Sequence, residues 1–525
     1  MLINLRDTLL AALARLPGTR EFHLHVLVSS PRKSASIFPF ATPRPRAYLQ
    51  DVLVLLSEQT TPDSPHILVA AIDASVYNIV STSSAILYIS KVDSTGQAMS
   101  PSPTYCLVKA FLAFYADPAT RPLAAEHLWI HLFARAQAQY LFPNSAEYAG
   151  KHPLSDIKLC AWWKRVFSDV AGELEARAQE PSLKLKLCYI LPGYSEFEAT
   201  HAIKNASSSS AACPSWTYGH PYSQTELMLP CPPVASEGKK NLGHFIPSFD
   251  DDPKSRFMDE IAYTTDGEVK SPTRKRSRTS SRDDGSHSNH REGVEEKEGK
   301  NGKDERPLGE LGKVTPDEFW ERMSFRQECV AGAVTGFFTL GISSSTATKD
   351  ASRSTISPLA PQPGQVSSQL NKRIVTTLTT NVEFSTVERA IRGTEIVEGA
   401  IRGLCEGIPP IPTTISHGPR TFPKPREFDR RTPEREISSQ PSLLAPPSTP
   451  PPRLVHGKRA IPDVSPNPFP EPVTSLETYH SHIYGTICVS NPVAAAKGAP
   501  GAVTKEESTG QVTVLTARKK KKKSD

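Results

Sequence analysis

Two long stretches of this chain are too poor in apolar side chains to belong to a hydrophobic core. Residues 265–312 include TRKRSRTSSRDDGSHSNHREGVEEKEGKNGKDER, in which almost every side chain is polar or charged. Residues 409–472 hold 18 of the 48 prolines. Neither stretch can bury enough apolar surface to offset the conformational entropy that is lost on folding. A packed fold must therefore be built from the remaining segments.

This constraint predicts five parts in the 525-residue chain. The first is a folded core, and the second is a disordered charged insertion. The third consists of helices that pack back on the core with a Ser/Thr-rich loop, and it is followed by a Pro-rich disordered region and a basic tail. The predicted ranges are 1–262, 263–314, 315–407, 408–511 and 512–525.

Hydrophobic periodicity indicates a mixed α/β fold for the core. Short runs of β-branched and apolar residues, bounded by turn residues, predict strands. Helical spacing predicts helices elsewhere, and Thr315 with Glu318 forms a capping-box pattern at the start of one of them. We expect a central mixed β-sheet that is wrapped by helices. The expected strands are 22–28, 67–72, 85–90 and 183–191, and the expected helices are 5–16, 155–174, 315–342 and 387–407.

Several common functions lose their usual support. The eight cysteines form no CxxC pair, which argues against zinc ribbons and thioredoxin-like sites. HLWIH (127–131) carries two histidines, but its alternating apolar residues predict a strand, on which the pair would not converge on a metal. No GxGxxG, Walker A or GxSxG motif occurs, and no run of 18 apolar residues predicts a membrane span. We therefore expect no bound metal and no membrane contact.

The net charge is +6, and basic residues gather in two clusters within the polar regions, 274–278 and 518–523. Such clusters are typical of nuclear import signals or nucleic-acid contacts, although solvated tails have the same composition. Import into the nucleus is the prediction for the tail of one arginine and five lysines.

One acidic turn stands out in this basic chain. FDDDPKSRF (249–257) places three aspartates directly before Pro253, and Lys254 follows the proline. Pro253 favours an extended backbone at Asp252. An exposed acidic turn with a local ion pair would explain the pattern at a worth of about 0–1 kcal/mol. The pattern alone favours this explanation over the alternative, a site that removes a proton from a cationic substrate.

Six segments, taken in order, resemble one protein family. They are YISKVDSTG (88–96), LFARAQAQYLFPNS (132–145), KHPLSD–AWW (151–163), FDDDPKSRF (249–257), FWERMSFRQEC (319–329) and VTVLTARKKKKK (512–523). No single motif is a strict signature, but the ordered set is specific. With this set, the chain is similar to the fungal, chaperone-dependent histone acetyltransferases of the regulator-of-Ty-transposition family, whose fold is similar to the CBP-type acetyltransferases.

The resemblance implies a set of catalytic residues. Asp251 and Asp252 match the acidic pair of the family, with Asp252 at the position assigned to proton transfer. Lys254 matches a lysine that acetylates itself. Trp163 and Tyr140 match residues that shape the lysine channel, although Trp163 also lies on an apolar helical stripe. One further carboxylate, Asp93, matches a position near the acceptor, although Asp-Ser-Thr-Gly is also an ordinary turn.

The resemblance also implies acetyl-CoA as cosubstrate. Free N–H groups at the start of the helix after SPSPTY would suit its phosphates. Some relatives carry arginines in this segment, whereas this chain does not, and Arg135 is a possible substitute. The matching coenzyme positions are Val92, Asp93, Ser94, Pro101, Ser102, Pro103, Thr104, Tyr105, Phe133, Gln137, His152, Pro153, Leu154 and Trp162.

The function that the resemblance implies is acetylation of a histone H3 lysine in the nucleus. The family acts on H3 with H4, depends on histone chaperones, and serves replication-coupled chromatin assembly and the response to DNA damage. Two alternatives remain open. A noncatalytic chromatin or nucleic-acid adaptor would share the basic tail and Pro-rich region, and an acetyltransferase could prefer nonhistone substrates. Direct binding of nucleic acid is left undecided.

Overall fold

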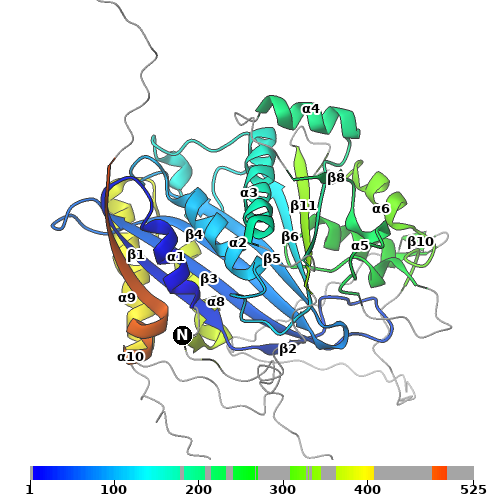
Figure 1. Cartoon of the computed structure of the whole chain (residues 1–525), viewed down its shortest axis with the longest axis horizontal. Coiled ribbons are helices and arrows are strands. Elements are labelled where there is room, and N and C mark those ends of the chain that lie inside the picture. Colours follow the sequence, from blue (N-terminus) through cyan, green and yellow to red (C-terminus); the bar gives the residue numbers. More distant parts are fainter. Residues whose placement is uncertain are drawn as a thin grey trace, which may run out of the picture.

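Long strands, most of them rich in Val, Ile, Leu and Ala, build the centre of the molecule. The computed structural model describes residues 4–177, 183–206, 214–231, 240–265, 268–269, 308–326, 329, 334–344, 362, 364–406 and 476–492. Within these ranges the chain forms one large mixed sheet with helices on both of its faces, which confirms the predicted mixed α/β class (Figure 1).

The described part of the large sheet has 11 strands. Its main path runs in the order β12-β1-β3-β4-β5-β6-β11-β7-β8, with β13 on β1 and β2 on β3. A separate hairpin joins β9 (Thr264–Thr265) and β10 (Glu268–Val269). The strands of the large sheet are β1 (Gly18–Ser29), β2 (Arg32–Ser34), β3 (Ala47–Gln59), β4 (Ile67–Ile79), β5 (Ser84–Ser94), β6 (His127–Arg135), β7 (Lys184–Ile190), β8 (Trp216–Tyr218), β11 (Thr335–Ser343), β12 (Gln365–Val366) and β13 (Tyr484–Asn491).

Alternating residues of each strand supply two different cores. On β3, Val52, Val54 and Leu56 join the core on one face, whereas Leu53 and Leu55 join a core on the other. This follows from the two-residue period of a strand. The helices that share the first core are α1 (Leu5–Leu13), α2 (Thr104–Ala116), α3 (Asp156–Arg177) and α4 (Glu196–Ala206).

Other helices cover the opposite face in two groups. One group, α8 (Ser368–Thr380) and α9 (Val387–Glu406), packs on β1, β3 and β4. The second group, α5 (Pro253–Tyr263) and α6 (Pro316–Met323), shares a core with Phe337 of β11. Short helical turns complete the described elements: η1 (Val80–Thr82), η2 (Ser145–Glu147), η3 (Pro221–Ser223), η4 (Leu242–His244), α10 (Leu476–Thr478) and η6 (Tyr479–Ile483).

Parallel pairing brings several strand ends to one edge of the sheet. β5 and β6 are parallel, and β11 runs antiparallel to both β6 and β7. The carboxyl ends of β5, β6 and β7 therefore lie at the same edge. The loops that follow β5 and β6 carry eight of the site residues that the sequence predicts: Pro101, Ser102, Pro103, Gln137, Tyr140, His152, Pro153 and Leu154.

The predicted helix over 315–342 is wrong for its second half. Thr315 caps α6 as expected, because its hydroxyl accepts a hydrogen bond from the Glu318 N–H at 3.2 Å. Residues 335–343, however, form β11, which lies between β6 and β7 in the sheet. Both faces of this strand are buried, so its apolar residues do not alternate with polar ones. Such a continuous run is compatible with either a buried strand or a buried helix, so the sequence pattern could not distinguish them.

The other strands and helices expected from the sequence are confirmed, with bounds that shift by a few residues. In the range predicted to be Pro-rich and disordered, residues 476–492 differ, because they pack on the core and form β13 beside β1. Both basic clusters, 274–278 and 518–523, lie outside the described residues. None of the helices in the described ranges is long and apolar enough to cross a membrane.

Candidate active site

The acidic turn is the start of α5. Asp252 is its N-cap residue, and its carboxylate accepts a hydrogen bond from the Lys254 backbone N–H at 2.9 Å. Pro253 occupies the first helical position, where its missing N–H has no consequence. The same carboxylate forms an ion pair with the Lys254 ammonium, and both side chains are buried. Asp252 and Lys254 thus form an ion pair that is excluded from solvent at the start of α5.

Lys254 lies in an aromatic pocket. Its Nζ is 4.6 Å from the centroid of the Phe249 ring and 5.8 Å from that of Phe337. Phe249 in turn stacks on Tyr88 of β5 at 4.1 Å. Burial lowers the pKa of Lys254, and the attraction of Asp252 opposes this shift. A lysine with a lowered pKa is more readily present as the neutral amine, which is the nucleophilic form.

A small void of about 10 Å³ adjoins Lys254. Two of the residues that line it, His131 and Trp320, have a buried ring nitrogen with no hydrogen-bond partner, Nε2 and Nε1 respectively. Burial lowers the pKa of His131, and the charge of Lys254 adds to this shift. Unpaired polar atoms in a core are costly unless a further group satisfies them. The mostly apolar lining of the void beside the lysine therefore includes two residues with unsatisfied polar atoms.

Asp251 faces outward, unlike its neighbour. Its backbone has φ +61°, a left-handed conformation that aspartate tolerates better than most residues. Its carboxylate lies 3.3 Å from the Nζ of Lys91, and the Asp73 carboxylate lies 4.0 Å from the same nitrogen. Burial raises the pKa of Asp73 to about 6, and Lys91 opposes that shift. Three charges thus extend the acidic turn along β4 and β5.

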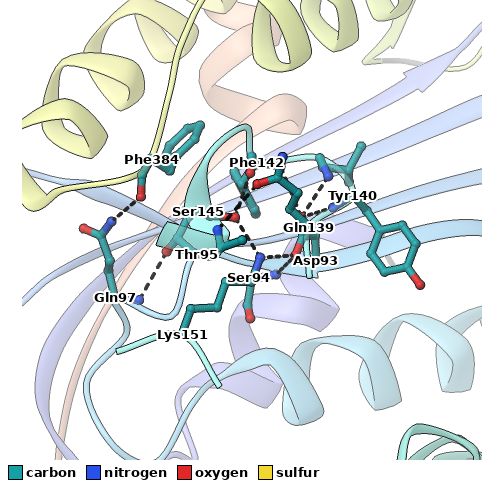
Figure 2. Close-up of polar contacts among 12 residues, drawn as sticks. Asp93, Ser94, Thr95, Gln97, Gln139, Tyr140, Phe142, Ser145, Lys151 and Phe384 are labelled. Carbon is teal, nitrogen blue, oxygen red and sulfur yellow. Dashed lines mark hydrogen bonds and ion pairs between the residues drawn. The ribbon is translucent and has the colours of Figure 1, made fainter. Parts of the chain in front are cut away.

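Asp93 anchors a loop. Figure 2 shows its carboxylate at the centre of a hydrogen-bonded network. Its Oδ2 accepts from the backbone N–H groups of Tyr140, Leu141 and Phe142 at 2.7, 2.8 and 3.1 Å. The other oxygen, Oδ1, lies 2.9 Å from the Nζ of Lys151 and accepts from the Ser94 N–H at 2.8 Å. With both oxygens engaged in this way, Asp93 is poorly suited to accept a substrate proton.

The two aromatic residues predicted for the lysine channel lie in different cores. Tyr140 packs partly buried against the core of α8 and α9. Its pKa is raised to about 12, first by burial and then by the Asp93 charge, whereas Arg135 opposes the rise. Trp163 is only 4% exposed and belongs to the core of the opposite face. Its neighbour Trp162 contacts it edge-on at 4.7 Å and is the more accessible of the two.

Some of the predicted coenzyme residues come together. Val92, Tyr105 and Trp162 pack against the same core, and the rings of Tyr105 and Trp162 lie 5.9 Å apart, edge to face. At the start of α2, the Ser102 hydroxyl accepts from the Thr104 N–H at 3.4 Å. The exposed members of the predicted set are Pro101, Ser102, Gln137, His152, Pro153 and Leu154.

One predicted coenzyme residue lies apart from this group. Phe133 points to the other face of the sheet, where its ring lies 5.2 Å from that of Phe337. A cavity of about 470 Å³ lies elsewhere, between β7, β8 and α6. None of the predicted catalytic or coenzyme residues lines it. The coenzyme prediction therefore points to the loops at the sheet edge, not to this cavity.

Comparison with known proteins identifies the family. The profile of the family described as histone acetyltransferase KAT11-type domain matches residues 119–399, which span β6, α3, β7, α5, α6 and β11. The chain belongs to this KAT11-type histone acetyltransferase family. The match covers the acidic turn, Tyr140 and the tryptophan pair, and so most of the site described above.

Individual relatives agree with this family. The KAT11-type chain is 32% identical over 300 residues to histone acetyltransferase rtt109 of Aspergillus flavus, covering 53% of this chain and 46% of the relative. It is 24% identical over 263 residues to histone acetyltransferase rtt109 of Schizosaccharomyces pombe, with coverages of 49% and 52%. The chain thus spans about half the length of the curated relatives that it matches.

A solved structure has the same fold. The crystal structure of Rtt109 from Aspergillus fumigatus superposes on the KAT11-type chain with a TM-score of 0.54 at 25% sequence identity. The superposition covers 75% of this chain and 96% of that one.

Sequence reasoning missed Lys91, Asp73 and Lys151. Lys91 and Asp73 lie on neighbouring strands, and only the register of β4 against β5 brings them to the acidic turn. Lys151 is 58 residues from its partner Asp93. A lysine directly before the predicted coenzyme residues 152–154 was the available signal, but its buried position could not be read from composition. In the described ranges, no cluster of three His, Cys, Asp or Glu side chains could hold a metal ion.

Proposed function

We propose that this chain is a histone lysine acetyltransferase that transfers the acetyl group of acetyl-CoA to a lysine of histone H3. The observation that carries the proposal is the family match over residues 119–399, which includes the buried Asp252–Lys254 pair. Two contacts at β5 support it further: Asp93 accepts the Tyr140 N–H, and Asp251 of the acidic turn lies beside Lys91.

The reaction needs a proton acceptor. A free lysine has a pKa near ~10.4, so the substrate amine is almost fully protonated at neutral pH. Asp251 is exposed and suited to attract a cationic chain, with Lys91 as its counter-ion. Asp252 is buried, and in this arrangement its carboxylate is engaged in the ion pair with the Lys254 ammonium. We assign Asp252 to proton transfer and Asp251 to substrate attraction.

Acetylation of Lys254 would release Asp252 from its counter-ion. The acetylated nitrogen is an uncharged amide, so the Asp252 carboxylate would no longer be engaged in an ion pair and could accept the substrate proton. Trp320, whose N–H is unpaired, lines the void beside Lys254 and is a candidate donor to the acyl carbonyl. Because a void of about 10 Å³ holds about one water, neighbouring side chains would have to shift to admit the acyl group. The lowered pKa of Lys254 supports its role as the nucleophile of this self-acetylation.

Acetyl-CoA would bind along the loops at the sheet edge. Tyr105 and Trp162 would offer aromatic surface to the coenzyme. The exposed loop residues 152–154 would offer further contacts. Arg135 at the end of β6 and the start of α2 are the candidates for the phosphates. Trp163 supports Trp162 from the core, and Asp93 holds the loop that carries Tyr140.

The proposed partners follow from the family. We expect H3 to be presented together with H4 by a histone chaperone, in the nucleus, during replication-coupled chromatin assembly and the response to DNA damage. The polar insertion at 263–314 and the Pro-rich region at 408–511 are the proposed contact regions, and the basic tail at 512–525 is the proposed import signal. Basic segments suit both import and attraction to acidic chaperones.

The test is acetyl transfer by the full chain. Purified protein is mixed with acetyl-CoA, H3–H4 and a histone chaperone, and the products are followed by mass spectrometry. The proposal expects coenzyme-dependent acetylation of H3 that increases with chaperone. Protein that binds no acetyl-CoA and transfers no acetyl group would replace it with a noncatalytic chromatin adaptor. Transfer to nonhistone lysines in preference to H3 would keep the reaction and change the substrate.

A further inference from the structure

We propose that Lys151 is a positioning residue, which fixes the loop of Tyr140 and the predicted coenzyme loops relative to each other through its ion pair with Asp93. The proposal rests on the proposed acetyl transfer, because its functional consequence is the affinity for acetyl-CoA. Lys151 touches neither reactant in this assignment. It acts through the segments that it holds together.

The ion pair is closed from solvent. Lys151 Nζ lies 2.9 Å from Asp93 Oδ1, and the two side chains are 6% and 5% exposed. The same nitrogen lies 2.7 Å from the Ser145 hydroxyl, which in turn donates to the Phe142 carbonyl at 2.7 Å. Figure 2 shows the Lys151 side chain extending from its own loop segment toward Asp93 and Ser145. The ammonium at one end of the 140–151 loop thus contacts Asp93 of β5 and Ser145 within the loop, and Asp93 in turn holds the other end through residues 140–142.

The backbones of the two segments also meet directly. Gly96 has φ +80°, and a Cβ built on it would lie 2.5 Å from the Lys151 Cα. Any side chain at position 96 would therefore be strained and would push the segment of Lys151 away. The contact brings the end of the 92–96 turn against the residue that precedes 152–154. Two predicted coenzyme segments are in this way held together at one point.

The charges explain why the lysine is needed for the loop geometry. The Asp93 carboxylate accepts three consecutive backbone N–H groups, from Tyr140 to Phe142, and it can hold them strongly only while it is ionised. Lys151 is the cation that stabilises this buried anion. Without the ammonium, the buried carboxylate would keep only its backbone N–H donors and would lose its counter-ion. A rearrangement of the loop would follow and would weaken the hold on Tyr140.

The matched control is another lysine in an ion pair. Lys109 on α2 lies 2.6 Å from Glu173, and the two side chains are 29% and 37% exposed. Exposed pairs of this kind contribute little. Lys109→Met therefore removes a lysine and an ion pair without touching the loops, whereas Lys151→Met removes the buried ammonium at nearly the same side-chain length.

The experiment measures hydrogen exchange and steady-state kinetics on the full chain. Lys151→Met should increase exchange of the amides of residues 140–142 by about tenfold or more and leave the α2 amides unchanged. The KM for acetyl-CoA should rise about tenfold or more, because a displacement of the contacts by about 1 Å can cost as much as 10²-fold. Lys151→Arg should retain most of the affinity. Gly96→Ala should raise the same KM with the charge pair intact.

Two results would overturn the proposal. Exchange that increases equally in the loop and in α2 would reduce Lys151 to a residue of general stability. Unchanged exchange at 140–142 together with an unchanged KM, as expected for Lys109→Met, would remove any role. If the unsubstituted chain transfers no acetyl group, the proposed function fails, but the exchange arm still decides whether Lys151 fixes the loop.

Discussion

At the scale of single residues, the raised pKa of Asp73 makes the stability of the fold depend on pH. Asp73 lies beside Lys91 near the acidic turn, and burial raises its pKa from 3.8 to about 6. The folded state therefore binds this proton more tightly than the unfolded state does. Its contribution to stability is greatest below about pH 4 and is lost as the pH rises through about 6.

Substitution of Asp73 tests this directly. Asp73→Asn cannot ionise, so the variant should gain in unfolding free energy relative to the unsubstituted chain as the pH rises through this window. At about 1.4 kcal/mol per pKa unit the change should reach about 3 kcal/mol at most. Denaturant unfolding at several pH values measures the difference. A difference that stays constant with pH would contradict the raised pKa.

The sequence pointed to candidate site residues but could not show which contacts they make, and their roles depend on those contacts. The resemblance pointed to Asp93 as a carboxylate near the acceptor, but its role depends on Lys151 and on the N–H groups of residues 140–142. Those partners lie about 50 residues away and arrive through the parallel pairing of β5 and β6. Trp163 likewise lay on an apolar stripe, and the structure places it in the core. Local pattern cannot supply such non-local contacts.

At the scale of elements, the segment around β13 is part of the core although it follows a long Pro-rich stretch. Ile483 is fully buried and shares a cluster with Leu141 and Phe142 of the Tyr140 loop. Arg6 of α1 donates to the carbonyls of His480 and Tyr484 at 2.6 and 2.9 Å. The segment around β13 thus packs against the buried side of the Tyr140 loop.

Truncation of one side chain tests this packing. Ile483→Ala should lower the unfolding free energy by about 2–5 kcal/mol, because a buried methyl-rich side chain is lost and a cavity remains. The matched control is Cys488→Ala on β13, where the side chain is exposed and the change should stay within about 0.5 kcal/mol. Equilibrium unfolding measures both. Equal stabilities of the two variants would mean that the segment does not pack as described.

The success of prediction also differs between elements. Amphipathic α1, α3 and α9 show their period plainly, because one face of each helix meets the core. Residues 335–343 were expected to be helical, yet they lie between β6 and β7 in the middle of the sheet. A strand buried on both faces has no alternation to read. Its partners lie far away in sequence, so only the folded structure identifies it.

At the scale of the whole molecule, the proposed coenzyme site is assembled from several distant segments and exists only in the folded chain. A ligand that binds the folded state alone raises the midpoint of thermal unfolding. Acetyl-CoA at about 100 times its Kd should add about 2.7 kcal/mol to the unfolding free energy. Differential scanning calorimetry measures the shift, and ATP serves as a control for phosphate charge. Equal shifts with both compounds would mean that binding is not specific for the coenzyme.

The central claim is that the buried Asp252–Lys254 pair governs acetyl transfer. Asp252→Asn is the sharpest test, because asparagine also caps helices and should leave α5 in place. The initial rate of H3 acetylation, with H4 and chaperone present, should fall by about 10²–10⁴-fold. Asp250→Asn, at an exposed position of the same turn, should transfer at nearly the original rate. Asp252→Asn that transfers within a few-fold of the unsubstituted chain would contradict the account.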